Sequence, residues 1–360
     1  MQKVSFSAKG EFYSELRKRV DSYFSEKGLK HTGNWQMYLK STIIITLFLV
    51  SYISLVFFSN SIVMGLISAF FLAQSFVLIG FNIMHDGNHG SYSKNKTINR
   101  IMGYTMDFLG SSHTLWKQKH NILHHTYTNI DGMDEDLETS GFLRLSPNQK
   151  WKPKYRLQHF YGIIIYSFLT LSLIFAGDFK KIWTGKIGKQ KIKKVKFTEQ
   201  LFFYGFKLIY FGYVIILPLF FHSFFYVLFF FLLIHFILGL TLALVFQLAH
   251  TVEPNAFPVP EKQTGNIENE WAIHQVETTA NFALQNKLAA WYLGGLNFQI
   301  EHHLFTNVCH IHYPEISKIV QQTSREFSIN YTTYPTLISA IGAHFKFLKR
   351  LGMKPQPVLS

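Results

Sequence analysis

The chain has 360 residues, of which 48% are hydrophobic, 17% aromatic and only 16% charged, and its 35 Lys and Arg against 21 Asp and Glu give a net charge of +14. Soluble domains carry about 25% charged residues, so this composition indicates a chain with much of its surface in lipid. A single cysteine excludes a disulfide scaffold, and the aromatic content excludes a disordered chain. The 17 histidines are the second unusual count.

Residues 1–40 are polar and basic and lack the apolar core of a signal peptide, so we expect a cytosolic N-terminal segment. Apolar runs close to the length of a bilayer span then occur in two pairs, each pair separated by a short polar break. We therefore predict an all-α integral membrane protein with four transmembrane helices in two hairpins, over residues 41–58, 62–84, 201–221 and 224–249. The membrane domain as a whole is expected over 41–325, with a cytosolic C-terminal segment over 326–360.

A shorter apolar segment, 160–176, has clusters of Lys and Arg on both sides. Positive charge marks the cytosolic side of a membrane, so we expect this segment to dip into the bilayer without crossing it. A weaker apolar stretch is expected to form an interfacial helix over 97–118. The basic flanks indicate topology or, alternatively, a site for lipid headgroups or coenzyme A phosphates. A nucleic-acid partner is not expected, because few aromatic residues are interleaved with the positive charges.

Many histidines fall into three short motifs and one span end. HDGNH (residues 85–89) starts where the second predicted span ends, HNILHH (120–125) and QIEHH (299–303) follow, and His250 comes directly after the fourth predicted span. A separation of four residues places two imidazoles on one face of a helix, where they can share a metal ion. Four spans bring the segments that follow the second and fourth spans to the same cytosolic face, so we expect the motifs to form a histidine-rich site in a cytosolic helical cap.

The number of these histidines indicates more than one metal ion. Imidazole binds zinc, copper, iron and nickel, so the ligand type alone does not select the metal. About eight ligands are too many for one tetrahedral zinc ion, and two metal ions are therefore implied. A pair of iron ions fits best, because histidine-rich iron sites with open positions activate dioxygen.

The motifs HDGNH, HNILHH and QIEHH, in this order and with this spacing around two hydrophobic pairs, resemble those of the membrane fatty acid desaturases over roughly residues 40–325. The leading Gln299 and the residues after His303 resemble the front-end subgroup, whose delta-5 and delta-6 members insert a double bond between an existing one and the carboxyl end. Many eukaryotic front-end enzymes carry a cytochrome b5 domain with an HPGG motif, which this sequence lacks. The chain is more similar to the shorter bacterial linoleoyl-CoA desaturase-like members, which implies a separate electron donor of the cytochrome b5 or ferredoxin type.

By this resemblance, seven motif histidines are carried over as catalytic metal ligands: His85, His89, His120, His124, His125, His302 and His303. His250 is expected as a further ligand, since desaturases of this type also take one from the end of the last span. Gln299 occupies a position that is histidine in other subgroups, so its contact with the metal, direct or through water, stays open.

Neighbouring polar residues are expected to orient these ligands, because a metal-bound histidine usually donates its other N–H to a carboxylate or carbonyl. The candidates for this role are Asp86, Asn121, Asp134, Asp136 and Glu301. A solvated acidic loop is an equal alternative for the two aspartates at 134 and 136. His274 is expected to support the site or the fold rather than to bind metal. The other histidines are expected to be hydrogen-bonded structural residues (His113, His310, His312) or interfacial and packed ones (His31, His159, His222, His235, His344).

Removal of hydrogen from an unactivated methylene requires an oxidant, because such a C–H bond offers no acid, base or leaving group. The resemblance implies that two iron ions, dioxygen and external electrons supply the oxidant. The protein then has to hold a long-chain fatty acyl group, carried on coenzyme A or on a lipid, with one carbon pair at the irons. We expect formation of a cis double bond in unsaturated fatty acid biosynthesis, on the cytosolic side of a membrane, with the bacterial inner membrane favoured over the endoplasmic reticulum.

Two other functions fit part of the pattern. A membrane hydroxylase or a sphingolipid or carotenoid-modifying enzyme uses similar histidine motifs, and product analysis separates it from a desaturase. A metal transporter with a histidine-rich site would place polar ligands near the middle of the bilayer, whereas nearly all histidines here lie outside the predicted spans.

Overall fold

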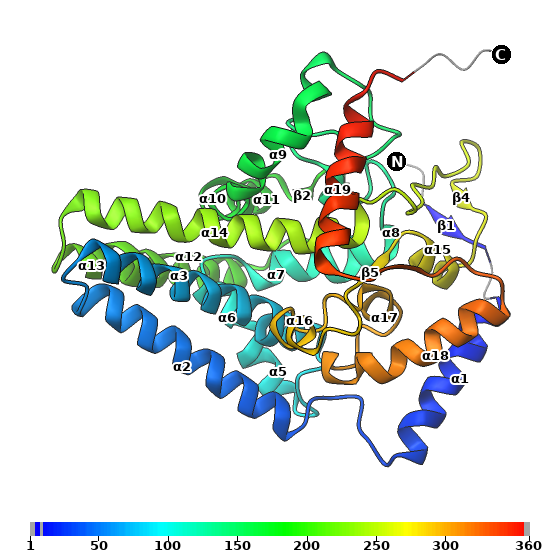
Figure 1. Ribbon diagram of the computed structural model, residues 1–360, viewed down its shortest axis with the longest axis horizontal. Helices are drawn as coiled ribbons and strands as arrows, with labels where there is room; N and C mark the ends of the chain where they lie inside the picture. The colour runs from blue at the N-terminus through cyan, green and yellow to red at the C-terminus, as the bar shows by residue number, and fades with distance from the viewer. Residues whose placement is uncertain (1–3, 8–9, 356–360) are drawn as a thin grey trace.

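Four long apolar helices lie alongside one another and form one half of the molecule (Figure 1). The computed structural model describes residues 4–7 and 10–355, and within these residues four helices are long and apolar enough to cross a membrane. Their bounds are Trp35–Phe57, Ile62–His89, Phe197–Leu219 and Phe224–His250. The predicted all-α membrane fold with four spans is confirmed.

Two of these spans are single helices, and two contain a π-helical turn. The first and fourth spans are α2 (Trp35–Phe57) and α14 (Phe224–His250). The second combines α3 (Ile62–Leu78), η1 (Ile79–Met84) and α4 (His85–His89), and the third combines α12 (Phe197–Phe211), η6 (Gly212–Ile216) and α13 (Leu217–Leu219). The first span begins at Trp35 rather than near residue 41, because the Asn34 side chain accepts a hydrogen bond from the Gln36 amide and caps the helix there.

The outer surface of this helical half is apolar. Leu208, Phe220 and Phe225 are 75%, 79% and 79% exposed, and they belong to the third and fourth spans and the tip between them. Large apolar side chains exposed to this extent over whole helices are typical of a surface that faces lipid.

A bent pair of helices lies beside α14. Pro153–Ser167 and Leu169–Thr184 meet at 56°, and they comprise η4 (Pro153–Leu157), α9 (Gln158–Ser167), α10 (Leu169–Ser172), η5 (Leu173–Gly177) and α11 (Asp178–Thr184). Gly239 of α14 permits the close approach, since a Cβ there would lie 2.5 Å from the carbonyl oxygen of Ser167. A break at this angle is compatible with a segment that enters a bilayer and returns, as predicted for 160–176.

The segment over 97–118 is not one interfacial helix. It contains three short helices, α5 (Lys96–Gly103), α6 (Thr105–Phe108) and α7 (His113–Trp116), and continues into the π-helical η2 (Lys117–His124) and α8 (His125–Tyr127). The turn before α7 is fixed by two buried carboxylates: Asp178 accepts from the Ser112 amide at 3.1 Å, and Asp107 lies 2.7 Å from Nδ1 of His113. Asp178 is far from Ser112 in the sequence, and the Asp107 contact forms only once the chain has turned, so the apolar pattern alone does not predict where the helix is interrupted.

The cap at the other end of the molecule is formed by shorter elements (Figure 1). Its helices are α1 (Glu11–Glu26), α15 (Trp271–Glu277), α16 (Lys287–Tyr292), α17 (Gln299–Leu304), α18 (Tyr313–Glu326) and α19 (Leu337–Gly352), with short 3-10 turns η3 (Glu135–Leu137) and η7 (His310–His312). In the described part of the chain, three two-stranded pairs complete the cap: β1 (Ser5–Phe6) with β4 (Asn266–Ile267), parallel; β2 (Lys186–Ile187) with β3 (Gln190–Lys191), antiparallel; and β5 (Ala280–Phe282) with β6 (Thr332–Tyr334), parallel.

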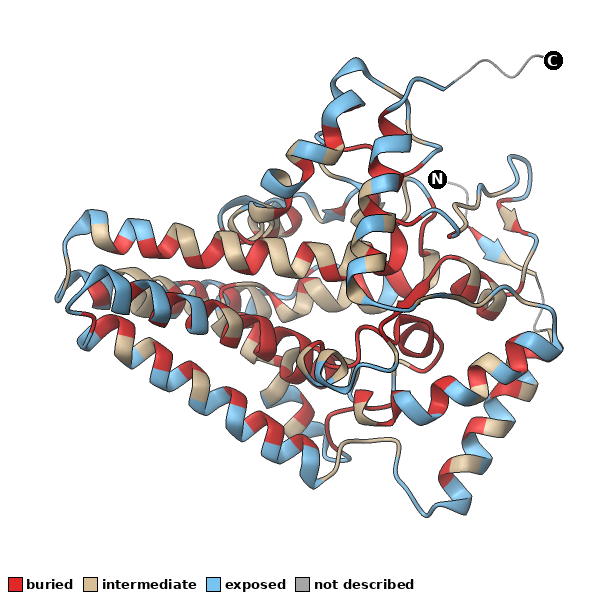
Figure 2. Cartoon of the chain, viewed as in Figure 1, coloured by how far each residue is buried: buried red, intermediate tan, exposed pale blue. Residues whose placement is uncertain are grey.

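Burial is most continuous where the spans meet the cap (Figure 2). All six residues of α17 are buried, and so are all three residues of β5, which contacts both α14 and α17. The C-terminal ends of the second and fourth spans, α4 and the end of α14, therefore converge on the helix that carries the third histidine motif.

Candidate metal centre

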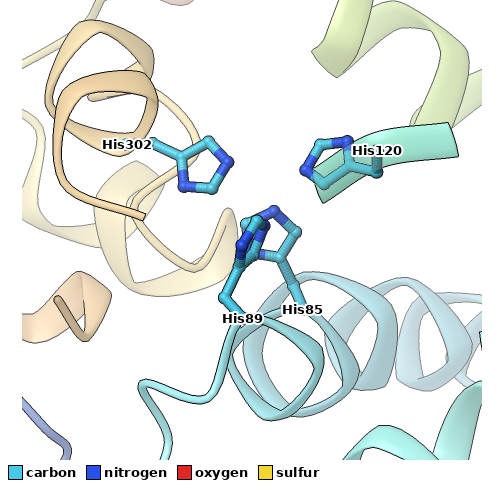
Figure 3. A group of neighbouring side chains, drawn as sticks. All are labelled: His85, His89, His120 and His302. Atoms are coloured by element: carbon cyan, nitrogen blue, oxygen red, sulfur yellow. The ribbon is translucent and has the colours of Figure 1, made fainter. Parts of the chain in front are cut away.

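Four histidines from three motifs surround one point (Figure 3). His85 and His89 lie on α4, His120 on η2 and His302 on α17, and one ring nitrogen of each lies within 4.8 Å of those of the others. The imidazole rings converge from three separate chain segments. We call these residues the first histidine group.

A second histidine group consists of His124, His250 and His303. Their donor atoms also lie within 4.8 Å of one another, and all three residues are buried. His250 is the last residue of α14, so the fourth span contributes a residue to this group. Seven of the eight histidines that the resemblance implies as ligands therefore lie in one or the other of these two groups.

The eighth, His125, lies between the two groups. Its ring centroid is 4.7 Å from that of His302 in the first group and 4.4 Å from that of His303 in the second. Its Nε2 lies 3.1 Å from Nε2 of His120. His120 and His125 are five residues apart, and in an α-helix their side chains would point about 140° away from each other around the axis. In a π-helical turn the backbone hydrogen bond joins residues i and i+5, so η2 brings both rings to the same side.

Six of these rings have one buried nitrogen without a hydrogen-bond partner among the described residues. This holds for Nε2 of His85, His89, His250, His302 and His303 and for Nδ1 of His125. Buried polar atoms are almost always paired, and a cluster of unpaired imidazole nitrogens is the donor set of a transition-metal site. The residues present thus fit two metal ions.

The outer nitrogens are held by partners that fix the ring orientation. Nδ1 of His124 lies 3.0 Å from the Asp134 carboxylate, Nδ1 of His303 lies 2.7 Å from Oε1 of Gln275, and Nδ1 of His302 lies 3.2 Å from the Tyr313 hydroxyl. A proton on Nδ1 that is donated outward leaves Nε2 free as a ligand.

Burial also determines the charge of the rings. It lowers the pKa of His120, His125, His302 and His303 well below 6.5, and the neighbouring histidines lower it further. For His124 the desolvation is outweighed by the carboxylate of Asp134, and its pKa is raised. Neutral imidazole is the form that binds metal, so burial keeps four of these rings ready for that role.

The predicted supporting residues occupy varied positions. Asp134 and, at 3.3 Å, Asp136 contact Nδ1 of His124, so the site includes this acidic loop. Asp86 faces Nδ1 of His85 at 3.8 Å and is hydrogen-bonded to His310. Asn121 instead donates to the backbone carbonyl of Asn88 at 3.0 Å, and so joins η2 to α4.

Three further predicted residues lie in α15 and α17. Gln299 is buried as the first residue of α17. Glu301 accepts hydrogen bonds from the Asn281 amide and the Tyr331 hydroxyl at 2.7 and 2.9 Å, and burial raises its pKa from 4.5 to about 7. His274 is buried against the ring of Phe6, whose centroid lies 5.0 Å away. Glu301 therefore holds α17 against β5 rather than a histidine ring.

Sequence reasoning missed two partners of the third motif. Gln275, the residue after His274, accepts from His303 and also from the Thr128 hydroxyl at 3.0 Å. Tyr313, which follows the histidines of η7, contacts His302. Neither residue stands at a motif spacing, and only the approach of α15 and α18 to α17 reveals them.

Comparisons with known proteins agree with this geometry. The family model "Fatty acid desaturase" matches residues 60–335. The chain is 40% identical to an sn-1 linoleoyl-lipid 6-desaturase of Synechocystis sp. over 98% of both chains, and 34% identical to a protein of the same description from Arthrospira platensis over 98% of this chain and 96% of that one. It is 38% identical to an acyl-lipid (8-3)-desaturase of Physcomitrium patens over 95% of this chain and 72% of the relative. The chain belongs to the fatty acid desaturase family, as its three histidine motifs predicted.

Proposed function

We propose that this enzyme is an oxygen-dependent front-end desaturase that introduces a cis double bond into a long-chain fatty acyl group carried on a membrane lipid. The single observation that carries the proposal is the pair of buried histidine groups with unpaired inward nitrogens, in a chain of this family. The 6-desaturases among the relatives support attack near carbon 6, with the delta-5 position as the alternative. Their descriptions as lipid desaturases favour an acyl-lipid over an acyl-CoA substrate.

The metal we propose is iron, two ions per chain. The first group, His85, His89, His120 and His302, would hold one ion, and His124, His250 and His303 would hold the other. His125 would serve at the boundary between them. Two bound iron ions would supply the oxidising power with which dioxygen, two electrons from outside and two protons remove two hydrogens from adjacent methylenes, leaving the alkene and two molecules of water.

The side chains of the protein supply position and exclude water. Trp116 stacks on His120 with ring centroids 4.3 Å apart and lies 5.7 and 5.5 Å from the rings of His85 and His89. This apolar cover keeps bulk water from the first group and holds the three rings in place, which favours reaction with a bound acyl chain over side reactions.

We place the histidine groups on the cytosolic side of a bacterial inner membrane. The cap that holds them also contains the basic segments around 150–156 and 180–196, and positively charged loops remain on the cytosolic side. The bent pair α9–α11 then enters the bilayer from that side. Electrons are supplied by a separate donor of the cytochrome b5 or ferredoxin type.

Fatty acid analysis of a host that expresses the protein and is fed linoleate tests the function. The wild type should produce a new double bond between the existing one and the carboxyl end, and His124→Ala should produce none. His222→Ala is a matched control, because that histidine lies at the tip between the third and fourth spans, where Nε2 lies 2.9 Å from the Val56 carbonyl oxygen and the ring stacks on that of Tyr226. Hydroxylated chains without a new alkene, or equal profiles for wild type and His124→Ala at equal protein levels, would refute the proposal.

A further inference from the structure

A buried lysine lies in the first span, outside both histidine groups. Lys40 of α2 is only 5% exposed, its Nζ lies 3.0 Å from Nε2 of His310, and it lies 5.1 Å from the centroid of the Trp291 ring. An ionisable side chain buried in a membrane-spanning helix is costly and usually has a function. No step of the proposed reaction uses it.

The contacts of His310 continue from Lys40 to the first histidine motif. A lysine ammonium can only donate, so Nε2 of His310 accepts and the ring proton is on Nδ1. Nδ1 lies 2.8 Å from Oδ2 of Asp86 and donates to it. The Cys309 thiol and the His310 amide donate to the same oxygen at 3.0 and 3.4 Å. Asp86 is thereby fixed by three donors, and its other oxygen faces Nδ1 of His85 at 3.8 Å.

The donor atoms of Asp86, Cys309 and His310 lie within 4.8 Å of one another, but they do not form a good metal site. The Cys309 thiol and Nδ1 of His310 are already hydrogen-bonded to the Asp86 carboxylate, and the Lys40 ammonium lies at the other ring nitrogen of His310, Nε2. A metal cation there would break these bonds and be repelled by the ammonium. The cluster is instead a neutral chain in which a buried cation balances a buried anion through an imidazole.

We propose that Lys40 is a positioning residue for the first histidine group, and that Lys40 acts on His85 through His310 and Asp86. The inference rests on the proposed metal centre. Lys40 selects the His310 tautomer that donates to Asp86, and this bond keeps the free carboxylate oxygen beside Nδ1 of His85. Nε2 of His85 then faces the other rings of its group, where it is buried and unpaired. The three segments joined in this way are α2, η7 and α4, which are far apart in the sequence.

Metal titration of the purified full chain tests this role without a desaturation assay. Apo protein in detergent is titrated with Co²⁺, and the cobalt absorption spectrum and the stoichiometry are recorded for wild type, Lys40→Met and Lys40→Arg. Lys40→Met should bind one of the two Co²⁺ ions about 10-fold more weakly and with an altered spectrum, as is usual for loss of an outer hydrogen bond at a metal site. Lys40→Arg keeps a cationic donor and should recover most of the affinity.

Lys207 offers a matched control. It is also 5% exposed within a span, but its Nζ donates to the carbonyls of Gly110 and Ile174 at 2.6 and 2.9 Å. Lys207→Met should therefore bind Co²⁺ as the wild type does, even where its melting temperature falls. Equal losses of affinity in Lys40→Met and Lys207→Met would overturn the proposal, and so would wild-type binding by Lys40→Met.

A second variant covers the case in which Lys40→Met does not accumulate. His310→Gln retains a polar group near Lys40 but removes the Nδ1 donor to Asp86, so the same 10-fold loss is expected and wild-type binding would overturn the role of Lys40. A wild-type chain that binds no Co²⁺ would overturn the metal centre and the role of Lys40 together. A chain that binds Co²⁺ as expected but desaturates no lipid would contradict only the proposed function.

Discussion

Gln275 is the residue through which the orientation of His303 can be tested most directly. Its side chain is fully buried, and its Oε1 accepts from Nδ1 of His303 at 2.7 Å and from the Thr128 hydroxyl at 3.0 Å. Gln275→Ala leaves the buried N–H of His303 without this acceptor, which costs about 1–3 kcal/mol of folding stability. The single proton of the Thr128 hydroxyl has the His124 carbonyl, at 2.7 Å, as its other acceptor, so the loss concentrates on His303.

The larger effect is expected on metal binding. A histidine without its outer partner can rotate or change tautomer, and loss of such a partner typically reduces metal affinity or activity 10- to 100-fold. Co²⁺ titration of the apo protein and fatty acid analysis of expressing cells measure the two consequences. Gln275→Glu supplies a carboxylate acceptor at the same place and should retain metal binding.

Gln158 is a matched control, since it is a second fully buried glutamine with no contact to the histidine groups. It accepts from the Arg144 amide at 2.8 Å and donates to the carbonyls of Arg144 and Leu348 at 3.0 and 2.8 Å. Gln158→Ala should lower the melting temperature at least as much as Gln275→Ala and leave metal affinity unchanged. If both variants lose metal equally, or if Gln275→Ala binds and turns over as the wild type does, then Gln275 does not orient His303.

Further predictions concern the remaining supports of the site. Gly294 has φ +60°, and an added Cβ would lie 2.4 Å from the Phe81 carbonyl oxygen, so Gly294→Ala should unfold at a clearly lower temperature than the wild type. Gly342 of α19 has open space around it, so the control Gly342→Ala should be neutral or stabilise the protein by up to about 1 kcal/mol. Asp134→Asn should lower the pKa of His124 in the apo protein, as followed by NMR titration, because the carboxylate is what raises it; an unchanged midpoint would contradict that cause. Removal of metal by a chelator should lower the melting temperature of the wild type, and that of His124→Ala by less, because only the first histidine group is intact in this variant; thermal unfolding measures both shifts.

The three histidine motifs predicted most of the candidate site because ligand spacing along a helix is a local property. His85 and His89 lie one turn apart on α4 as expected, and they meet His120 and His302 because four spans return the chain to the same face. The position of His125 differed from the simple helical expectation, since η2 is π-helical. No residue in HNILHH indicates the π-helical turn.

Contacts made only in the folded chain could not be predicted in this way. Gln275 reaches His303 because α15 packs against α17, and Lys40 reaches His310 because the capped start of α2 extends the first span toward the cap. The prediction of a single helix over 97–118 failed for the same reason, because Asp178, far along the chain, holds the turn at Ser112. Local patterns therefore located the histidines of the two groups, whereas the residues that hold these histidines in place depend on tertiary contacts.

The pH dependence of the apo protein follows from the balance between these buried groups. Burial lowers the pKa from 6.5 for four histidines outside the spans: His120, His125, His302 and His303. Below about pH 6.5 the unfolded chain therefore binds more protons than the folded chain, and the free energy of unfolding decreases as the pH falls. Glu301 acts in the opposite direction, since its pKa is raised from 4.5 to about 7 and the folded chain holds the extra proton between these values. His124, whose pKa the Asp134 carboxylate raises, acts in the same direction as Glu301. Four groups outweigh two, so urea unfolding of the apo protein should show stability decreasing from pH 7 to pH 5, and Glu301→Gln should make the decrease steeper. Stability that stays constant or rises over this range would mean that the rings are charged in the folded apo protein, and that burial does not hold them in the metal-binding form.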